Sequence, residues 1–183
     1  MRIIAGEWRS RLLRAPAGDA TRPSADRTRE TLFAMLASRL GSFEGLAVAD
    51  LFAGSGALGL EALSRGAATC LFVEHEAEAL RALRANIAAL RAAQQASVEP
   101  RSVMHLAPAR APYDLLLLDP PYGSGAGAVA LDRLARLGWI GPASWVALET
   151  AADEATPVKS MVVESERRVG RAKLTLLRLP AAA

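Results

Sequence analysis

The chain has 183 residues, and 51% of them are apolar, so it is long enough to bury one full-sized core in a single domain. No apolar run is long enough to span a bilayer, and the N-terminus lacks the apolar stretch of a signal peptide, which favours a soluble cytoplasmic protein with no membrane partner. The single cysteine, Cys70, excludes an intrachain disulfide and a cysteine-based zinc site, so no metal is expected, and its apolar neighbours predict a buried position.

Residues 1–41 are predicted to form a hairpin and a helix ahead of the main fold. Short strands over residues 2–5 and 11–14 flank a turn, and a linker with Pro and Gly spans residues 16–23. Apolar residues at helical spacing then predict a helix over residues 24–40, which a glycine ends.

Strands and helices alternate from residue 42 onward. The predicted strands cover residues 46–52, 69–74, a short stretch near Val98, 113–119, 144–149, 159–166 and 173–179. The predicted helices end near Arg65 and cover residues 76–93 and 129–137. This alternation predicts an α/β fold with a doubly wound, mostly parallel, seven-stranded Rossmann-like sheet, whose ligands bind at the carboxyl ends of the strands.

Positive charge is concentrated in the first 31 residues. They carry seven arginines against four acidic residues, whereas the rest of the chain carries 15 basic and 15 acidic residues, so the whole net charge of +3 lies in this segment. Arginine binds phosphate bidentately and stacks on bases, which suits a nucleic-acid surface. A codon bias toward Arg explains the abundance of arginine equally well, but it does not explain the asymmetry along the chain.

A glycine-rich turn, Asp50-Leu51-Phe52-Ala53-Gly54-Ser55-Gly56-Ala57-Leu58-Gly59, follows the first strand of the alternating region. Glycines directly after a strand let a ligand approach the backbone, and the next helix offers its N–H groups. The same spacing satisfies the dinucleotide fingerprint G-x-G-x-x-G, so the turn alone does not identify the ligand. Asp50 favours a ligand with an ammonium and a sulfonium, because a carboxylate would repel a pyrophosphate.

Glu74 ends the next strand. A carboxylate at this place can accept hydrogen bonds from the hydroxyls of an adenosine ribose, a feature that NAD and S-adenosylmethionine sites share. The residue therefore supports a nucleoside cofactor without choosing between the two. The neighbouring His75 has no partner in the sequence that would orient it, and we expect it at the surface.

The motif Asp119-Pro120-Pro121-Tyr122 follows the most apolar strand. Two prolines cannot extend a strand ladder, so the chain leaves the sheet on a stiff path that fixes the Asp119 carboxylate and the Pro120 carbonyl as two acceptors. An exocyclic amino group of a base presents two N–H donors. Binding both of them turns the nitrogen lone pair toward a methyl donor, and Tyr122 can stack on the base.

With this motif the chain resembles the Rossmann-fold methyltransferases that carry D/N-P-P-Y/F/W, and among them the bacterial 16S rRNA guanine-N2 methyltransferase family (RsmD). The resemblance covers nearly the whole chain, including residues 1–9, 21–33 and 52–65 and the segment Arg168-Val169-Gly170. The N-terminal segments separate this family from other enzymes with the same motif. The resemblance implies that residues 42–183 bind S-adenosylmethionine and residues 1–41 bind RNA. We expect the protein to be a monomer.

The resemblance also implies roles for individual residues. The methionine part of the cofactor would be held by Asp50, Ala53, Gly54, Ser55 and Gly56, and its ribose by Glu74. The target amine would be held by Asp119, Pro120, Pro121 and Tyr122. The partner, 16S rRNA or an assembling small ribosomal subunit, would be gripped by Arg2, Arg9, Arg11, Arg14, Arg22 and Arg27. The family usually has an Asp or Asn followed by Ala after its third strand, where the side chain meets the adenine amine, and here Ser102 is the candidate substitute.

Three other functions remain open at this point. An adenine-N6 methyltransferase acting on DNA or RNA would use the same acceptors at Asp119 and Pro120, but 183 residues leave no room for a separate target-recognition domain. A nicotinamide-dependent oxidoreductase explains the glycines but not the D-P-P-Y motif. An RNA-binding module without catalysis is disfavoured by the intact motif.

Overall fold

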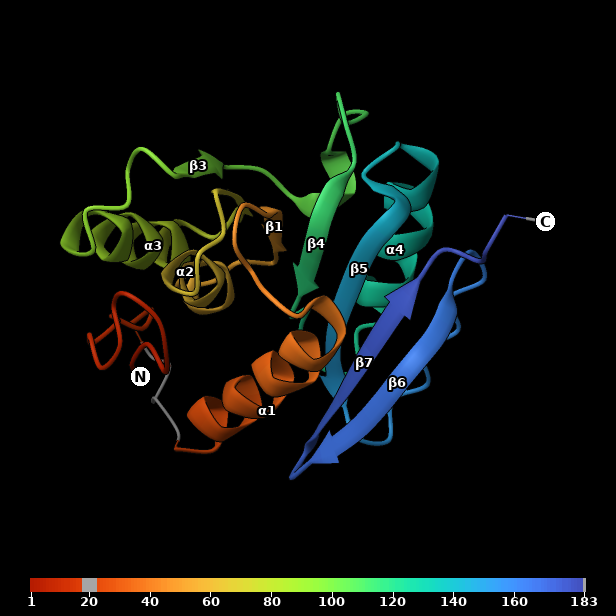
Figure 1. Cartoon of the computed structure of the whole chain (residues 1–183), viewed down its shortest axis with the longest axis horizontal. Coiled ribbons are helices and arrows are strands. Elements are labelled where there is room, and N and C mark those ends of the chain that lie inside the picture. Colours follow the sequence, from red (N-terminus) through yellow and green to blue (C-terminus); the bar gives the residue numbers. More distant parts are fainter. Residues whose placement is uncertain (18–22, 183) are drawn as a thin grey trace.

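The computed structural model describes residues 1–17 and 23–182 (Figure 1). The strands are β1 (Ala47–Leu51), β2 (Thr69–Val73), β3 (Ala96–Glu99), β4 (Tyr113–Leu118), β5 (Ile140–Ala151), β6 (Val162–Val169) and β7 (Ala172–Arg178). The helices are α1 (Pro23–Leu40), α2 (Ala57–Ser64), α3 (Ala77–Ala89) and α4 (Ala126–Arg136), and a 3₁₀ turn spans Val103–His105. None of the helices in the described part of the chain is long and apolar enough to cross a membrane.

The seven strands form one sheet in the order β3-β2-β1-β4-β5-β7-β6. The first five strands are parallel, and β7 is antiparallel to both of its neighbours. The helices α1, α2 and α3 pack on one face, and α4 with the 3₁₀ turn packs on the other (Figure 1). The predicted doubly wound Rossmann-like sheet is confirmed, and its strand order reverses between β1 and β4, where such sheets bind ligands.

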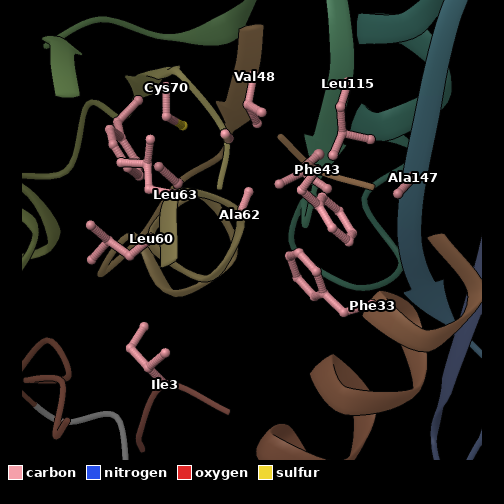
Figure 2. Close-up of a cluster of buried hydrophobic side chains, with 14 of the residues drawn as sticks. Ile3, Phe33, Phe43, Val48, Leu60, Ala62, Leu63, Cys70, Leu115 and Ala147 are labelled. Atoms are coloured by element: carbon pink, nitrogen blue, oxygen red, sulfur yellow. The ribbon is translucent and has the colours of Figure 1, made fainter. Parts of the chain in front are cut away.

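The central strand β4 is buried on both faces, as its apolar sequence predicts. Leu115 belongs to the core under α1 and α2, which Figure 2 shows, whereas Leu116 belongs to the core under α4. Phe33 of α1 packs against Phe43 with ring centroids 5.5 Å apart. Cys70 is 1% exposed and lies in the same core as Phe33, which confirms its predicted burial.

The N-terminal segment turns back on itself, but the two predicted strands do not form. Within residues 1–17, strand-like pairing is limited to one isolated antiparallel bridge between Arg2 and Leu12. The N–H groups of Ile4 and Ala5 donate instead to the carboxylate of Glu61 in α2, at 2.9 and 3.0 Å. The two predicted strands do not pair further because the backbone N–H groups that a strand would use donate to α2.

Several other boundaries differ from the prediction: the helix predicted over residues 76–93 ends at Ala89, and the one predicted over 129–137 begins at Ala126. The strand predicted over residues 144–149 extends to Ile140–Ala151, because extra residues between Ile140 and Trp145 bulge out of β5 and let Ile140 pair with Tyr113 of β4. The strand predicted from residue 159 begins at Val162, because the N–H and hydroxyl of Ser160 both donate to Asp132 of α4 and keep that stretch in a loop.

Candidate active site

A cleft of about 1390 Å³ opens at the carboxyl ends of the parallel strands. The three predicted motifs meet in it, because Ala53–Ser55 follow β1, Glu74 follows β2 and residues 119–122 follow β4. Part of α1 and the turn between β6 and β7 complete its walls. The volume is large enough for a nucleoside cofactor together with a second planar group.

The turn after β1 exposes its backbone to the cleft at Gly54. Gly54 has a φ of +57°, and no atom of the described residues lies within 4 Å of where a Cβ would stand. Gly56 also has a positive φ, but a Cβ there would lie 2.5 Å from Leu83, so this glycine lets the turn pack on α3 rather than lining the cleft. Behind the turn, the side chain of Asn86 donates to the Ser55 carbonyl at 2.9 Å.

Asp50 lies behind the turn rather than on the cleft surface. Its side chain is 1% exposed, and its Oδ2 accepts the N–H of Gly59 at 2.8 Å. Its buried Oδ1 has no hydrogen-bond partner among the described residues. Burial and the charge of Glu74 raise the pKa of Asp50 from 3.8 to about 8, against the opposing effect of the Gly59 hydrogen bond. The structure therefore does not place Asp50 where the sequence suggested, in direct contact with a ligand ammonium.

Glu74 lines the cleft and organises the loop around it. Its Oε2 accepts the N–H of Gly54 at 2.7 Å, and its Oε1 accepts the N–H groups of His75 and Glu76 at 2.8 and 2.9 Å. A carboxylate offers about four acceptor positions, so one position, on Oε2, is left for a ligand hydroxyl. Glu74 thus ties the turn after β1 to the end of β2.

Asp119 faces the cleft next to a second acid, Glu149 of β5. Leu118 and Leu148 are register partners, so the two acids follow paired positions of parallel strands. Asp119 is exposed to the cleft, but its position against the protein, together with the charges of Glu149 and Asp50, raises the pKa of its carboxyl above the usual value.

Tyr122 is 49% exposed, and its hydroxyl donates to Glu149 Oε1 at 2.5 Å. Burial and this hydrogen bond raise the pKa of Tyr122, which keeps the phenol protonated as a donor. The glycine loop that follows is held by Glu154, whose carboxylate accepts the N–H groups of Gly123 and Gly125 at 2.9 and 3.3 Å. The ring therefore lies at the cleft wall with its polar tip fixed.

Residues 1–178 match the model of a family described as Conserved hypothetical protein 95. The chain belongs to this family. It is 36% identical over 157 residues to ribosomal RNA small subunit methyltransferase D of Escherichia coli strain K12, with 86% of this chain and 78% of the relative covered. Identity to the protein of the same name from Haemophilus influenzae is 36% over 158 residues, covering 84% and 80%. The resemblance to the RsmD family is confirmed.

Solved structures agree with this assignment. The Escherichia coli protein yhhF superposes with a TM-score of 0.84 at 33% identity, covering 100% of this chain and 99% of that one. The Haemophilus influenzae protein HI0767 gives 0.79 at 32% identity, covering 97% of both chains. The chain therefore shares the fold of these solved relatives.

The cleft wall near β3 differs from what the sequence suggested for the adenine subsite. The hydroxyl of Ser102 accepts the N–H of Met104 at 3.2 Å and thereby caps the 3₁₀ turn. Its neighbours Arg101 and Val103 line the cleft instead, together with His75, whose side chain is 56% exposed as expected. Arg101 pairs with Glu99 at 2.6 Å.

The arginines proposed to grip RNA are exposed where the structure describes them: Arg2, Arg9, Arg11, Arg14 and Arg27. Arg22 lies outside the described residues. Arg27 lines the cleft, whereas Arg11 also donates to the Ala89 carbonyl at 2.8 Å. Arg29, which contributed to the charge asymmetry, is 4% exposed and pairs with Asp26 at 3.1 Å, so it serves the fold.

Glu149 and Glu154 are the site residues that sequence reasoning missed. Neither belongs to a recognisable motif, and a single acid after an apolar strand is a common pattern at a sheet edge. The signal that could have found Glu149 is its place at the end of the strand next to the one carrying Asp119, since parallel neighbours present their ends together.

Proposed function

We propose that this chain transfers a methyl group from S-adenosylmethionine to the N2 amine of a guanine in 16S rRNA. The observation that carries the proposal is the position of the D-P-P-Y motif, which faces the same cleft as the glycine turn and Glu74. Membership of the family, and the names of its relatives from Escherichia coli and Haemophilus influenzae, support rRNA as the substrate class.

The residues present fit a nucleoside cofactor with a methionine tail. The open space at Gly54 lets a ligand lie against the backbone, and Glu74 keeps one acceptor position for a ribose hydroxyl. We infer that Ala53, Gly54 and Ser55 hold the tail, with Asp50 and Gly56 shaping the turn from behind. When bound, S-adenosylmethionine supplies an electrophilic methyl group.

Asp119 would act on the target amine by position rather than as a strong base. A guanine amine is nearly non-basic, and it loses a proton easily only after methylation has made it cationic. The chain therefore needs to hold the amine in line with the methyl group, and Asp119 with the Pro120 carbonyl provides two acceptors on a rigid path. Tyr122, half exposed beside them, provides a ring on which the base can stack.

The test is single-turnover methylation of unmodified 16S rRNA, followed by nuclease digestion and mass mapping. We expect one N2-methylguanine, and methylation of an adenine would instead support the N6 alternative. Asp119→Ala should lower the rate by at least about 100-fold, the usual scale for losing a preorganised contact. Binding of S-adenosylhomocysteine, measured by calorimetry, should be largely kept. A near-normal rate in Asp119→Ala would contradict the mechanism.

A further inference from the structure

Tyr122 stands at the start of a short loop in which Ser124 donates its N–H and its hydroxyl to the Pro121 carbonyl, at 3.4 and 2.6 Å, and these bonds close the turn without reaching the Tyr122 ring. The residues that follow are Gly123-Ser124-Gly125, and both glycines adopt positive φ angles, of 71° and 66°. Glycines allow many backbone conformations, so such a loop does not by itself hold a ring in one orientation. A stacking surface for a base must nevertheless be oriented before the base arrives, since small misplacements at a reacting centre are costly.

Two acidic side chains, one on the neighbouring strand β5 and one just after it, supply the missing restraint. Glu149 accepts the Tyr122 hydroxyl at 2.5 Å and fixes the tip of the ring. Glu154 accepts the N–H groups of Gly123 and Gly125 and fixes the backbone behind it. Glu154 is placed in turn by the N–H of Ala151 at the end of β5, at 3.2 Å, and by Lys173, which donates to its carbonyl. Both restraints come from β5 and the residues just after it.

We propose that Glu149 is a positioning residue, which presents the face of the Tyr122 ring to the target base through the hydrogen bond to its hydroxyl. The role rests on the proposed function, because it presupposes a base in the cleft. Glu149 is suited to it because it is half-buried and follows the register partner of Leu118, so it sits in the rigid sheet rather than in the loop. A charged acceptor also makes a stronger hydrogen bond than a neutral one.

The role makes a prediction that a purely structural role of Glu149 does not make. If Glu149 acts through the Tyr122 hydroxyl, then Glu149→Ala and Tyr122→Phe remove the same interaction, and the double variant should be no slower than either single one. Glu149→Gln keeps an acceptor oxygen and should recover most of the rate. If Glu149 acted on the fold, the two losses would multiply and Gln would give no specific recovery.

The experiment measures single-turnover methylation of in vitro transcribed 16S rRNA by the full chain, over a range of RNA concentrations. We expect each single variant to lose roughly 10- to 100-fold in rate at saturating RNA, the scale of a misplaced reacting group. Affinity for S-adenosylhomocysteine and the melting temperature should stay near the parental values. Glu166→Ala, which removes an exposed acid of β6 away from the cleft lining, is the matched control and should be active.

The outcomes separate the two proposals. An active parental enzyme with a normal rate in Glu149→Ala would overturn the positioning role alone, and so would multiplicative losses in the double variant. A parental enzyme that methylates no rRNA would overturn the proposed function, and the positioning role would fall with it.

Discussion

Asp119 and Glu149 end neighbouring strands, so the charge on one acid affects the protonation of the other. The surrounding protein and the charges of Glu149 and Asp50 raise the pKa of Asp119 above its usual value, although the residue is exposed to the cleft. Only the deprotonated carboxylate is a pure acceptor for an amine. Asp119 gains that form as the pH rises through its raised pKa, so the methylation rate should increase with pH over that range.

Glu149→Gln removes one negative charge and should therefore lower the pKa of Asp119. The rising limb of the rate profile should move to lower pH, while the rate on the plateau stays close to the parental one. Single-turnover rates measured between about pH 5 and 9 would check this shift. An unmoved limb would mean that another group controls the profile.

At the scale of elements, α3 joins the N-terminal segment to the cofactor turn through one side chain. Asn86 is 1% exposed, and its Oδ1 accepts the N–H of Arg14 at 2.8 Å. Its Nδ2 donates to the carbonyls of Arg14 and Ser55, both at 2.9 Å. The same amide thus holds a segment proposed to bind RNA and a turn proposed to bind the cofactor.

Asn86→Ala should therefore weaken two functions as well as the fold. Removing the amide leaves buried backbone groups without partners, which costs about 1–3 kcal/mol per group in unfolding free energy. Urea unfolding gives this loss, and calorimetry should show weaker binding of S-adenosylhomocysteine. Asn86→Asp keeps the acceptor for the Arg14 N–H but loses the donor to the carbonyls of both Arg14 and Ser55. The turn at Ser55 loses its bond to this side chain entirely, whereas Arg14 keeps one, so cofactor binding should suffer more than the attachment of the N-terminal segment. Unchanged cofactor affinity in both variants would remove Asn86 from this role.

Prediction from the sequence succeeded for elements whose structure depends on their own residues. It failed for elements whose structure depends on partners far away in the sequence. The buried strand β4 and the turn at Gly54 follow from local apolar runs and glycines, and both were predicted. The N-terminal strands were not formed, because Glu61 takes the donors of Ile4 and Ala5 from 57 and 56 residues away. Glu149 was missed for the same reason, since its partner Tyr122 lies 27 residues away, in the loop after β4.

At the scale of the whole molecule, exposed arginines lie on two segments that contribute residues to the walls of the cleft. Arg9 and Arg14 are exposed on the N-terminal segment, and Arg168 and Arg171 are exposed at the turn between β6 and β7, which lines the cleft. An RNA lying across the cleft could contact both groups. The count of charges along the sequence indicated only the arginines of the N-terminal segment. Around Arg168 and Arg171 the acidic residues nearby in the sequence hide the positive charge in such a count.

Paired substitutions test this arrangement. Arg9→Ala with Arg14→Ala, and separately Arg168→Ala with Arg171→Ala, should each reduce the slope of log affinity against log salt by roughly 1.5, the expected loss for two phosphate contacts. Arg110→Ala with Arg136→Ala is the matched control, because these exposed arginines lie toward the amino ends of β4 and β5. Filter binding of 16S rRNA fragments at several salt concentrations provides the slopes. A parental slope in both cleft pairs would exclude this path for the RNA.

The attachment of the N-terminal segment has a consequence for the order of events during synthesis. Its backbone is held by Glu61, Ser64 and Asn86, which lie 56 to 72 residues further along the chain. The residues of this segment leave the ribosome before α2 and α3 do, and they therefore cannot dock until those helices have been made. Closing so long a loop carries an entropy cost, and the contacts that offset it form only when the segment docks. The arginines of this segment consequently lack their mature positions until much of the domain has been made. If they bind RNA as proposed, a growing chain cannot bind it with the mature geometry.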